Sequence, residues 1–64
     1  MNLTKKQIDI IRELTPKKLI GKQISSYRTL GYYRPYSANW AYEACWVEYK
    51  GTLYLVVRQF GQIV

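Results

Sequence analysis

The sequence predicts an α+β domain in which one N-terminal amphipathic helix packs on a three-stranded antiparallel sheet. Three patterns support this fold. Runs rich in aromatic and β-branched residues flank Lys50-Gly51, a capped helix start lies near the N-terminus, and the segment from Gln23 to Tyr32 divides into two alternating sets of residues, as the two faces of a strand do. The chain has 64 residues, which is the size of one small domain, so we expect residues 1–64 to share a single modest core.

The two aromatic runs are predicted to form a β-hairpin, whose register depends on the loop length. A two-residue loop, Lys50-Gly51, sets Glu43 opposite Arg58, an opposite-charge pair, whereas a three-residue loop leaves Glu43 facing Val57. We therefore favour the two-residue loop. This register also gathers one apolar face from both strands, made of Tyr42, Ala44, Trp46, Leu53, Leu55 and Val57.

A helix is predicted to begin after Thr4, a favourable N-cap residue. Gln7 stands where it can return a hydrogen bond to the cap, and the helix should end at Thr15-Pro16 because the residue before proline is kept out of the helical region. At about 100° per residue, the apolar side chains share one half of the helix. We expect this half to be buried: Leu3, Ile8, Ile10, Ile11 and Leu14.

The segment after the helix is predicted to continue as a short turn and then a strand. Pro16 to Ile20 has the form of one helical turn, with Thr15 as its cap and Gly21 after its end. From Ile24 to Tyr32 the residues alternate in the manner of a strand, which we expect to lie beside the hairpin as the third strand of the sheet.

The same segment allows a second interpretation as a winged helix-turn-helix. Thr15-Pro16, Leu19 and the run Ser26-Tyr27-Arg28-Thr29-Leu30 occur in the order that many such motifs show, so this part of the chain resembles a helix-turn-helix. The resemblance implies a recognition helix from Tyr27 to Tyr33, with the hairpin as its wing. The pattern departs from the motif at Gln23, where an apolar residue normally packs the helices together.

Nothing in the sequence predicts export or membrane insertion. Asp9, Arg12 and Glu13 interrupt the region where a signal peptide would need an unbroken apolar run, and the longest apolar run, Leu53–Val57, is too short to span a bilayer. The single cysteine, Cys45, cannot form an internal disulfide, which fits a reducing compartment. We therefore expect a cytoplasmic protein without membrane association, and Cys45 as a small apolar strand residue.

The residue types also exclude several catalytic sites. Without histidine there is no Ser-His-Asp triad, no Cys-His pair and no histidine-ligated zinc. The four acidic residues are spread singly, which argues against a paired-carboxylate site or a metal cage, and the glycines match no phosphate-binding loop. We expect a protein that is not an enzyme, with no catalytic residues, no metal and no cofactor.

The charge of the chain is concentrated in its first half. The net charge is +6, and residues 1–34 hold eight of the ten basic residues and two of the four acidic ones, so residues 35–64 sum to zero. Between Lys17 and Tyr36 the bases have no acid among them and alternate with tyrosines. A concentrated positive charge favours partners that carry phosphates or acidic side chains.

This basic, tyrosine-rich stretch predicts a nucleic-acid-binding surface, for DNA or RNA. Cations replace the counterions around phosphates, and aromatic rings stack on unpaired bases. The expected phosphate contacts are Lys17, Lys18, Lys22, Arg28 and Arg34, and the expected stacking residues are Tyr27, Tyr32, Tyr33, Tyr36 and Trp40.

An alternative function of a different class is docking on another protein. Tyr, Trp and Arg are the residue types that most often anchor protein interfaces, and a basic surface is attracted to acidic patches. Small chains without catalytic residues are often encoded by phages and mobile elements to inhibit or redirect a host protein, such as a nucleic-acid enzyme. An apolar sheet face left uncovered also leaves homodimer formation open.

Overall fold

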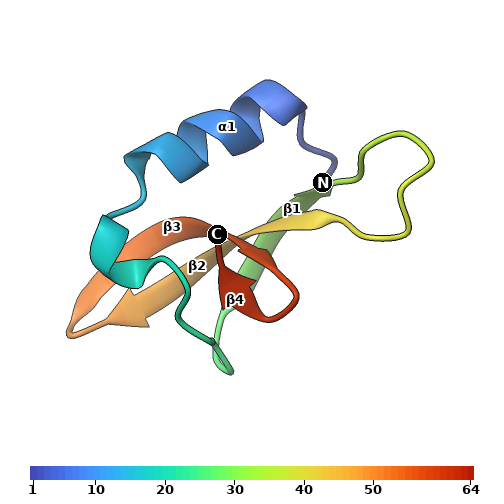
Figure 1. Ribbon diagram of the computed structural model, residues 1–64. Helices are drawn as coiled ribbons and strands as arrows, with labels where there is room; N and C mark the ends of the chain where they lie inside the picture. The colour runs from blue at the N-terminus through green and yellow to red at the C-terminus, as the bar shows by residue number, and fades with distance from the viewer.

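One α-helix packs on one face of a four-stranded antiparallel sheet (Figure 1). The computed structural model describes all 64 residues. The predicted α+β class is confirmed, but the prediction of three strands is wrong, because the C-terminal residues add a fourth. The elements are the helix α1 (Lys5–Leu14), the 3-10 turn η1 (Lys17–Leu19), and the strands β1 (Arg28–Tyr33), β2 (Tyr42–Tyr49), β3 (Thr52–Gln59) and β4 (Gln62–Ile63), with strand order β1-β2-β3-β4.

The central hairpin of β2 and β3 has the predicted register. Glu43 pairs with Arg58, and the register continues without a shift to Tyr49 and Thr52, which flank the two-residue loop Lys50-Gly51. Both loop residues have positive φ, 50° for Lys50 and 81° for Gly51, which is the conformation that the right-handed twist of paired strands favours in a tight hairpin loop.

The fourth strand comes from a second tight turn that the sequence pattern does not reveal. Phe60 and Gly61 both have positive φ, 53° and 80°, and they turn the chain back so that β4 pairs with the end of β3. A glycine adopts this conformation readily, whereas a phenylalanine adopts it at a cost. The C-terminal residues therefore fold back along β3.

Residues 21–24 pair with the other side of β4 and make the sheet curl. Gly21 N–H donates to the Ile63 carbonyl at 2.7 Å, and Ile63 N–H donates to the Lys22 carbonyl at 2.9 Å. Strand β1 begins only four residues after Ile24, so one stretch of chain pairs with β4 at its start and with β2 at its end. The predicted strand from Ile24 to Tyr32 is therefore two separate pairing segments, and only the second is a regular strand.

The winged helix-turn-helix alternative is wrong, because the proposed recognition helix is β1. Tyr27 lies just before this strand, and residues 28–33 pair with β2, with a bulge between Thr29 and Gly31. Threonine and tyrosine favour strands, and here they pair with a central strand that is buried on both faces.

Helix α1 begins and ends where the sequence predicts. Thr4 and Gln7 form the reciprocal capping box, and the last helical residue precedes Thr15-Pro16. The predicted cap of the next turn is wrong, because the Thr15 hydroxyl donates to the Ile11 carbonyl at 2.7 Å and η1 has no side-chain cap.

The buried face of α1 is narrower than predicted. Ile8 is fully buried, whereas Ile10 is 46% exposed and Leu14 is 77% exposed, so the prediction that both are buried is wrong. The helix rests on the small side chains of Ala44 and Val57, and this contact needs only one narrow stripe of the helix surface.

The sheet is buried on both faces, which gives the protein two small cores. Neighbouring residues of a strand point to opposite faces. Ala44 and Val57 form one core together with Leu3 and Ile8, which confirms the predicted burial of Leu3 and Ile8. The opposite face lies inside the curl of the sheet and is filled by Leu19, Cys45, Val47, Val56 and Ile63. Val56 and Val57 are buried on opposite faces, which explains why the apolar residues of β3 are consecutive here rather than alternating.

The molecule is elongated, with principal extents of 36 × 21 × 20 Å. The β2–β3 turn and η1 lie at one end, which we call the hairpin end, and the connection of residues 34–41 lies at the other, the loop end (Figure 1). Helix α1 starts close to the loop end and runs toward η1.

Candidate nucleic-acid interface

A cluster of lysines surrounds two tyrosine rings at the hairpin end. Tyr49 and Tyr54 are diagonal neighbours on the inner face of the sheet, because Tyr54 pairs with Val47, two residues before Tyr49. Lys18 Nζ lies 5.9 Å from both ring centroids, and Lys22 Nζ lies 5.2 Å from the Tyr49 centroid. Lys50 Nζ lies 5.4 Å from the same centroid, so three ammonium groups are within cation–π range of one ring.

Three different elements hold these lysines in place. Lys18 belongs to η1, which is anchored by the fully buried Leu19. Lys22 lies in the segment whose backbone pairs with β4, and Lys50 is part of the β2–β3 turn. The positions of the three lysines therefore depend on the pairing of residues 21–24 with β4, as well as on η1 and the β2–β3 turn.

The lysines of this end have no acidic partner. The structure has two ion pairs, Lys5 with Asp9 and Arg58 with Glu43, and neither is at the hairpin end. The nearest acid in the sequence, Glu48, adjoins Tyr49 but points to the opposite face of the sheet. We refer to the unpaired lysines of this end, Lys17, Lys18, Lys22 and Lys50, as the hairpin-end lysines.

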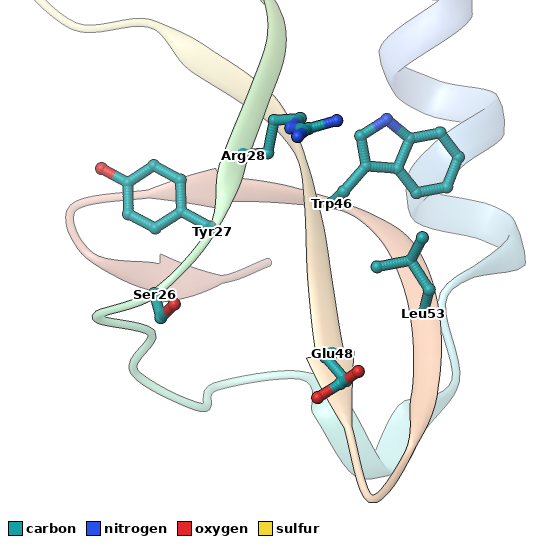
Figure 2. Close-up of a pocket in the computed structure, with 6 residues that line it drawn as sticks. All are labelled: Ser26, Tyr27, Arg28, Trp46, Glu48 and Leu53. Atoms are coloured by element: carbon teal, nitrogen blue, oxygen red, sulfur yellow. The ribbon is translucent and has the colours of Figure 1, made fainter.

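A shallow groove lies on the face of the sheet that carries α1, at a part of that face the helix leaves open. Figure 2 shows Trp46 and Leu53 side by side, with Arg28 on one flank and Glu48 nearer the hairpin tip. The groove has a volume of about 740 Å³. Trp46 is half-buried, whereas Leu53 is 62% exposed, so the floor is apolar and accessible. The complete lining is Ser26, Tyr27, Arg28, Trp46, Glu48 and Leu53.

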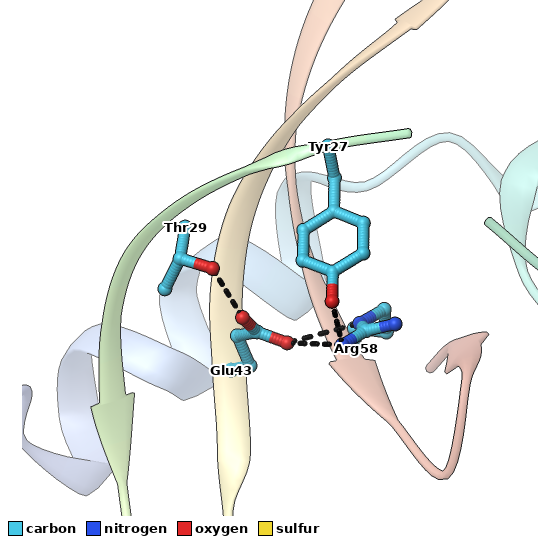
Figure 3. Close-up of polar contacts among 4 residues, drawn as sticks. All are labelled: Tyr27, Thr29, Glu43 and Arg58. Atoms are coloured by element: carbon cyan, nitrogen blue, oxygen red, sulfur yellow. Dashed lines mark hydrogen bonds and ion pairs between the residues drawn. The ribbon is translucent and has the colours of Figure 1, made fainter. Parts of the chain in front are cut away.

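A partly buried polar network crosses the inner face between the two ends of the molecule (Figure 3). Arg58 donates to one oxygen of Glu43 from Nε at 2.9 Å and from Nη2 at 2.7 Å, and Thr29 Oγ1 donates to the other oxygen. The Arg58 guanidinium also stacks on the Tyr27 ring, with its carbon 3.8 Å from the centroid, and donates to the Tyr27 hydroxyl. Burial opposes the charge of Arg58, but the hydrogen bonds and charge of Glu43 outweigh it and raise the pKa of the guanidinium.

The residues predicted as one binding surface are divided between the two ends. Lys17, Lys18 and Lys22 lie at the hairpin end, and Arg28 lines the groove. Tyr27 also borders the groove, but one face of its ring is covered by Arg58. These five residues share one half of the molecule.

The remaining predicted contacts lie toward the loop end. Arg34 and Tyr36 belong to the connecting loop, where Tyr36 is 99% exposed. Trp40 is half-buried and packs edge-on against Tyr42, with ring centroids 5.1 Å apart. Tyr33 packs partly buried against the core under α1, and Tyr32 is 48% exposed at the same end of β1.

Sequence reasoning missed the residues that the hairpin contributes. The predicted surface excludes Lys50, Tyr49 and Tyr54, because the second half of the chain carries no net charge. The net charge of the second half does not show that Lys50 lies beside Tyr49 on the inner face, whereas Glu48 points to the opposite face. The signal was present in the predicted register, which already makes Tyr49 and Tyr54 diagonal neighbours beside Lys50.

Other kinds of site find little support in this geometry. No group of three or more His, Cys, Asp or Glu side chains converges, and neither helical segment has the length and apolar composition needed to cross a bilayer. Comparisons of the chain with protein-family models, with curated proteins and with solved structures give no match.

Proposed function

We propose that this protein binds nucleic acid without catalysing a reaction, and that the hairpin-end lysines contact the phosphates. The observation that supports this most directly is the set of three ammonium groups around the Tyr49 ring with no carboxylate beside them. Like charges held together repel one another, and a phosphate backbone would relieve that repulsion. Arg28 and Trp46 in the adjacent groove add a cation and a stacking surface.

The proposal predicts a characteristic dependence on salt. Each phosphate contact releases condensed counterions, so the logarithm of the binding constant falls linearly with the logarithm of the salt concentration. With four lysines in contact, the slope should be about −2.8 for a single strand and about −3.6 for a double strand. A binding mode dominated by apolar contacts would show a slope close to zero.

A pair of charge-matched variants tests which lysines are responsible. Lys18→Gln with Lys22→Gln removes two charges of the cluster, and Lys5→Gln with Lys6→Gln removes two charges from the start of α1, near the loop end (Figure 1). The first variant should reduce the salt slope by about 1.5, whereas the second should bind nearly as the wild type does. The measurement is fluorescence anisotropy with a labelled oligonucleotide over a salt series. Equal weakening by both variants would show that net charge alone matters, and no binding at about 50 mM salt would reject the proposal.

A second candidate function is docking on a host protein, and exposed apolar side chains favour it. Leu14 and Phe60 are 77% and 81% exposed, and each leaves a large apolar side chain that a partner protein would cover. Purification of the tagged protein from lysate with and without nuclease separates the two functions. One stoichiometric protein that remains bound after nuclease treatment would favour docking, whereas loss of all bound material would favour nucleic acid.

A further inference from the structure

The groove beside Trp46 combines one flat aromatic surface with two unpaired charges of opposite sign. Trp46 pairs with Leu55 across the hairpin, and Glu48 pairs with Leu53, so these side chains stand on one face. Arg28 lies opposite Trp46 on the other neighbouring strand. Figure 2 shows the Arg28 guanidinium extending toward the indole, and Glu48 on the side of the hairpin tip.

Both charged groups of the groove are free to bind a ligand. Arg28 and Glu48 are exposed, and neither forms an ion pair or a side-chain hydrogen bond, with the other or with any other residue. Residues of opposite charge that border one groove without pairing leave a donor and an acceptor available. The volume of about 740 Å³ is in the range of small-molecule sites.

The carboxylate of Glu48 determines which part of a nucleic acid suits the groove. It would repel a phosphate, so the groove is better suited to a base than to the backbone. A carboxylate only accepts hydrogen bonds. Guanine has two adjacent donors, N1–H and the N2 amino group, on one edge, whereas adenine and cytosine place an acceptor nitrogen beside their amino group, and uracil and thymine have one N–H between two carbonyls.

We infer that the groove binds one unpaired guanine of a strand held by the hairpin-end lysines. Glu48 accepts from the N1–H and N2 amino groups, Arg28 donates to the O6 or N7 acceptors, and the base stacks on Trp46. The base must be unpaired, because Glu48 occupies the edge that would otherwise pair with cytosine. This inference rests on the proposed function and adds to it a preference for single strands that contain guanine.

The test compares short oligouridylates that differ in one central nucleotide. Trp40→Phe leaves Trp46 as the only tryptophan, so its fluorescence reports on the groove alone. The oligomer with a central guanosine should bind roughly tenfold more tightly than the all-uridine oligomer and should quench Trp46. Inosine lacks the N2 amino group, so an oligomer with central inosine should lose most of this advantage.

Two variants distinguish failure of this inference from failure of the proposed function. Glu48→Gln should reduce the guanosine preference to less than about twofold without weakening the all-uridine complex, because an amide also offers a donor to the base edge. Lys18→Gln with Lys22→Gln should weaken all oligomers alike and keep the preference. Equal affinity for all oligomers in the wild type would overturn the guanine site and leave the proposed function intact. Absence of binding to any oligomer would overturn both, and the groove would then be better explained by a protein partner.

Discussion

Cys45 shows how strongly the inner face of the curled sheet disfavours charge. Its side chain is fully buried in the core that also contains Val47 and Val56. Burial, together with the charge of Glu43, raises the pKa of the thiol to about 11, and the charge of Arg58 partly opposes this shift. At neutral pH the thiol is therefore protonated and packs as a small apolar group, as the sequence predicted.

This buried thiol makes the stability of the protein depend on alkaline pH. The pKa of Cys45 rises from 9.0 to about 11 on folding, so its contribution is complete below pH 9.0 and is lost as the pH approaches 11. The free energy of unfolding of the wild type should fall, relative to that of Cys45→Ala, by about 2 kcal/mol over this interval. Urea unfolding followed by tryptophan fluorescence measures both proteins. Parallel pH profiles for the two would show that Cys45 is not responsible.

The predicted pair of Glu43 and Arg58 is part of a larger network on the inner face of the sheet. The hairpin register alone placed Arg58 opposite Glu43. In the structure both side chains are largely buried. Thr29 donates to the second oxygen of Glu43, and the Tyr27 hydroxyl accepts from Arg58. Burying this pair requires that its hydrogen bonds be satisfied, which ties β1 to the central hairpin.

Strand β1 is held at its outer edge by the N-terminal residues. Leu3 N–H donates to the Tyr32 carbonyl at 2.7 Å, and Tyr32 N–H donates to the Met1 carbonyl at 3.0 Å. This close approach depends on Gly31, because a Cβ at that position would lie 2.6 Å from the Met1 oxygen and 3.2 Å from Leu3 Cγ. The N-terminal segment thus covers part of an edge that would otherwise be open to pairing with other chains.

Gly31→Ala should detach this segment from β1 while the central hairpin remains folded. We expect a loss of roughly 2 kcal/mol in the free energy of unfolding, because a methyl group is forced against backbone atoms that cannot rotate away. Amide hydrogen exchange of Leu3 and Tyr32 should become faster, and the amides of β2 and β3 serve as an internal control. Faster exchange throughout the chain would instead indicate a general loss of stability, and unchanged exchange would show that the contact is not tight.

The pairing of β4 with residues 21–24 helps to position the lysines of the proposed binding surface. Ile63 is 2% exposed in the inner core and its backbone holds residues 21–24. Those residues carry Lys22 and follow directly on η1, which carries Lys17 and Lys18. The cluster therefore depends on β4, although β4 contributes none of its charges.

Ile63→Ala should consequently weaken nucleic-acid binding without changing any charge. A buried Ile→Ala substitution costs roughly 2–5 kcal/mol, which is a large part of the stability of so small a domain, and Ile63→Val should cost about 1 kcal/mol. At a temperature where circular dichroism shows the variants to be folded, affinity should decrease in the order wild type, Ile63→Val, Ile63→Ala. Val64→Ala is the control, because Val64 packs on the opposite core. Unchanged affinity in folded Ile63→Ala would mean that the lysines bind nucleic acid equally well without tight packing of β4 against residues 21–24.

The sequence by itself determined the features that depend on a few neighbouring residues. The cap at Thr4, the end of α1 before Pro16 and the loop at Lys50-Gly51 were predicted correctly. In each case a side chain or a backbone preference acts on residues at most four positions away, so the local pattern contains the necessary information. The register of the central hairpin follows from its loop for the same reason.

Only the tertiary structure decided how distant parts of the chain meet. The pairing of residues 21–24 with β4 joins positions about forty residues apart, and it brings Lys18 and Lys22 to Tyr49. It also separates these lysines from Arg34 and Tyr36, their neighbours in the charge pattern. Such contacts depend on how far the sheet curls and on which apolar groups fill it, quantities that no short stretch of sequence contains.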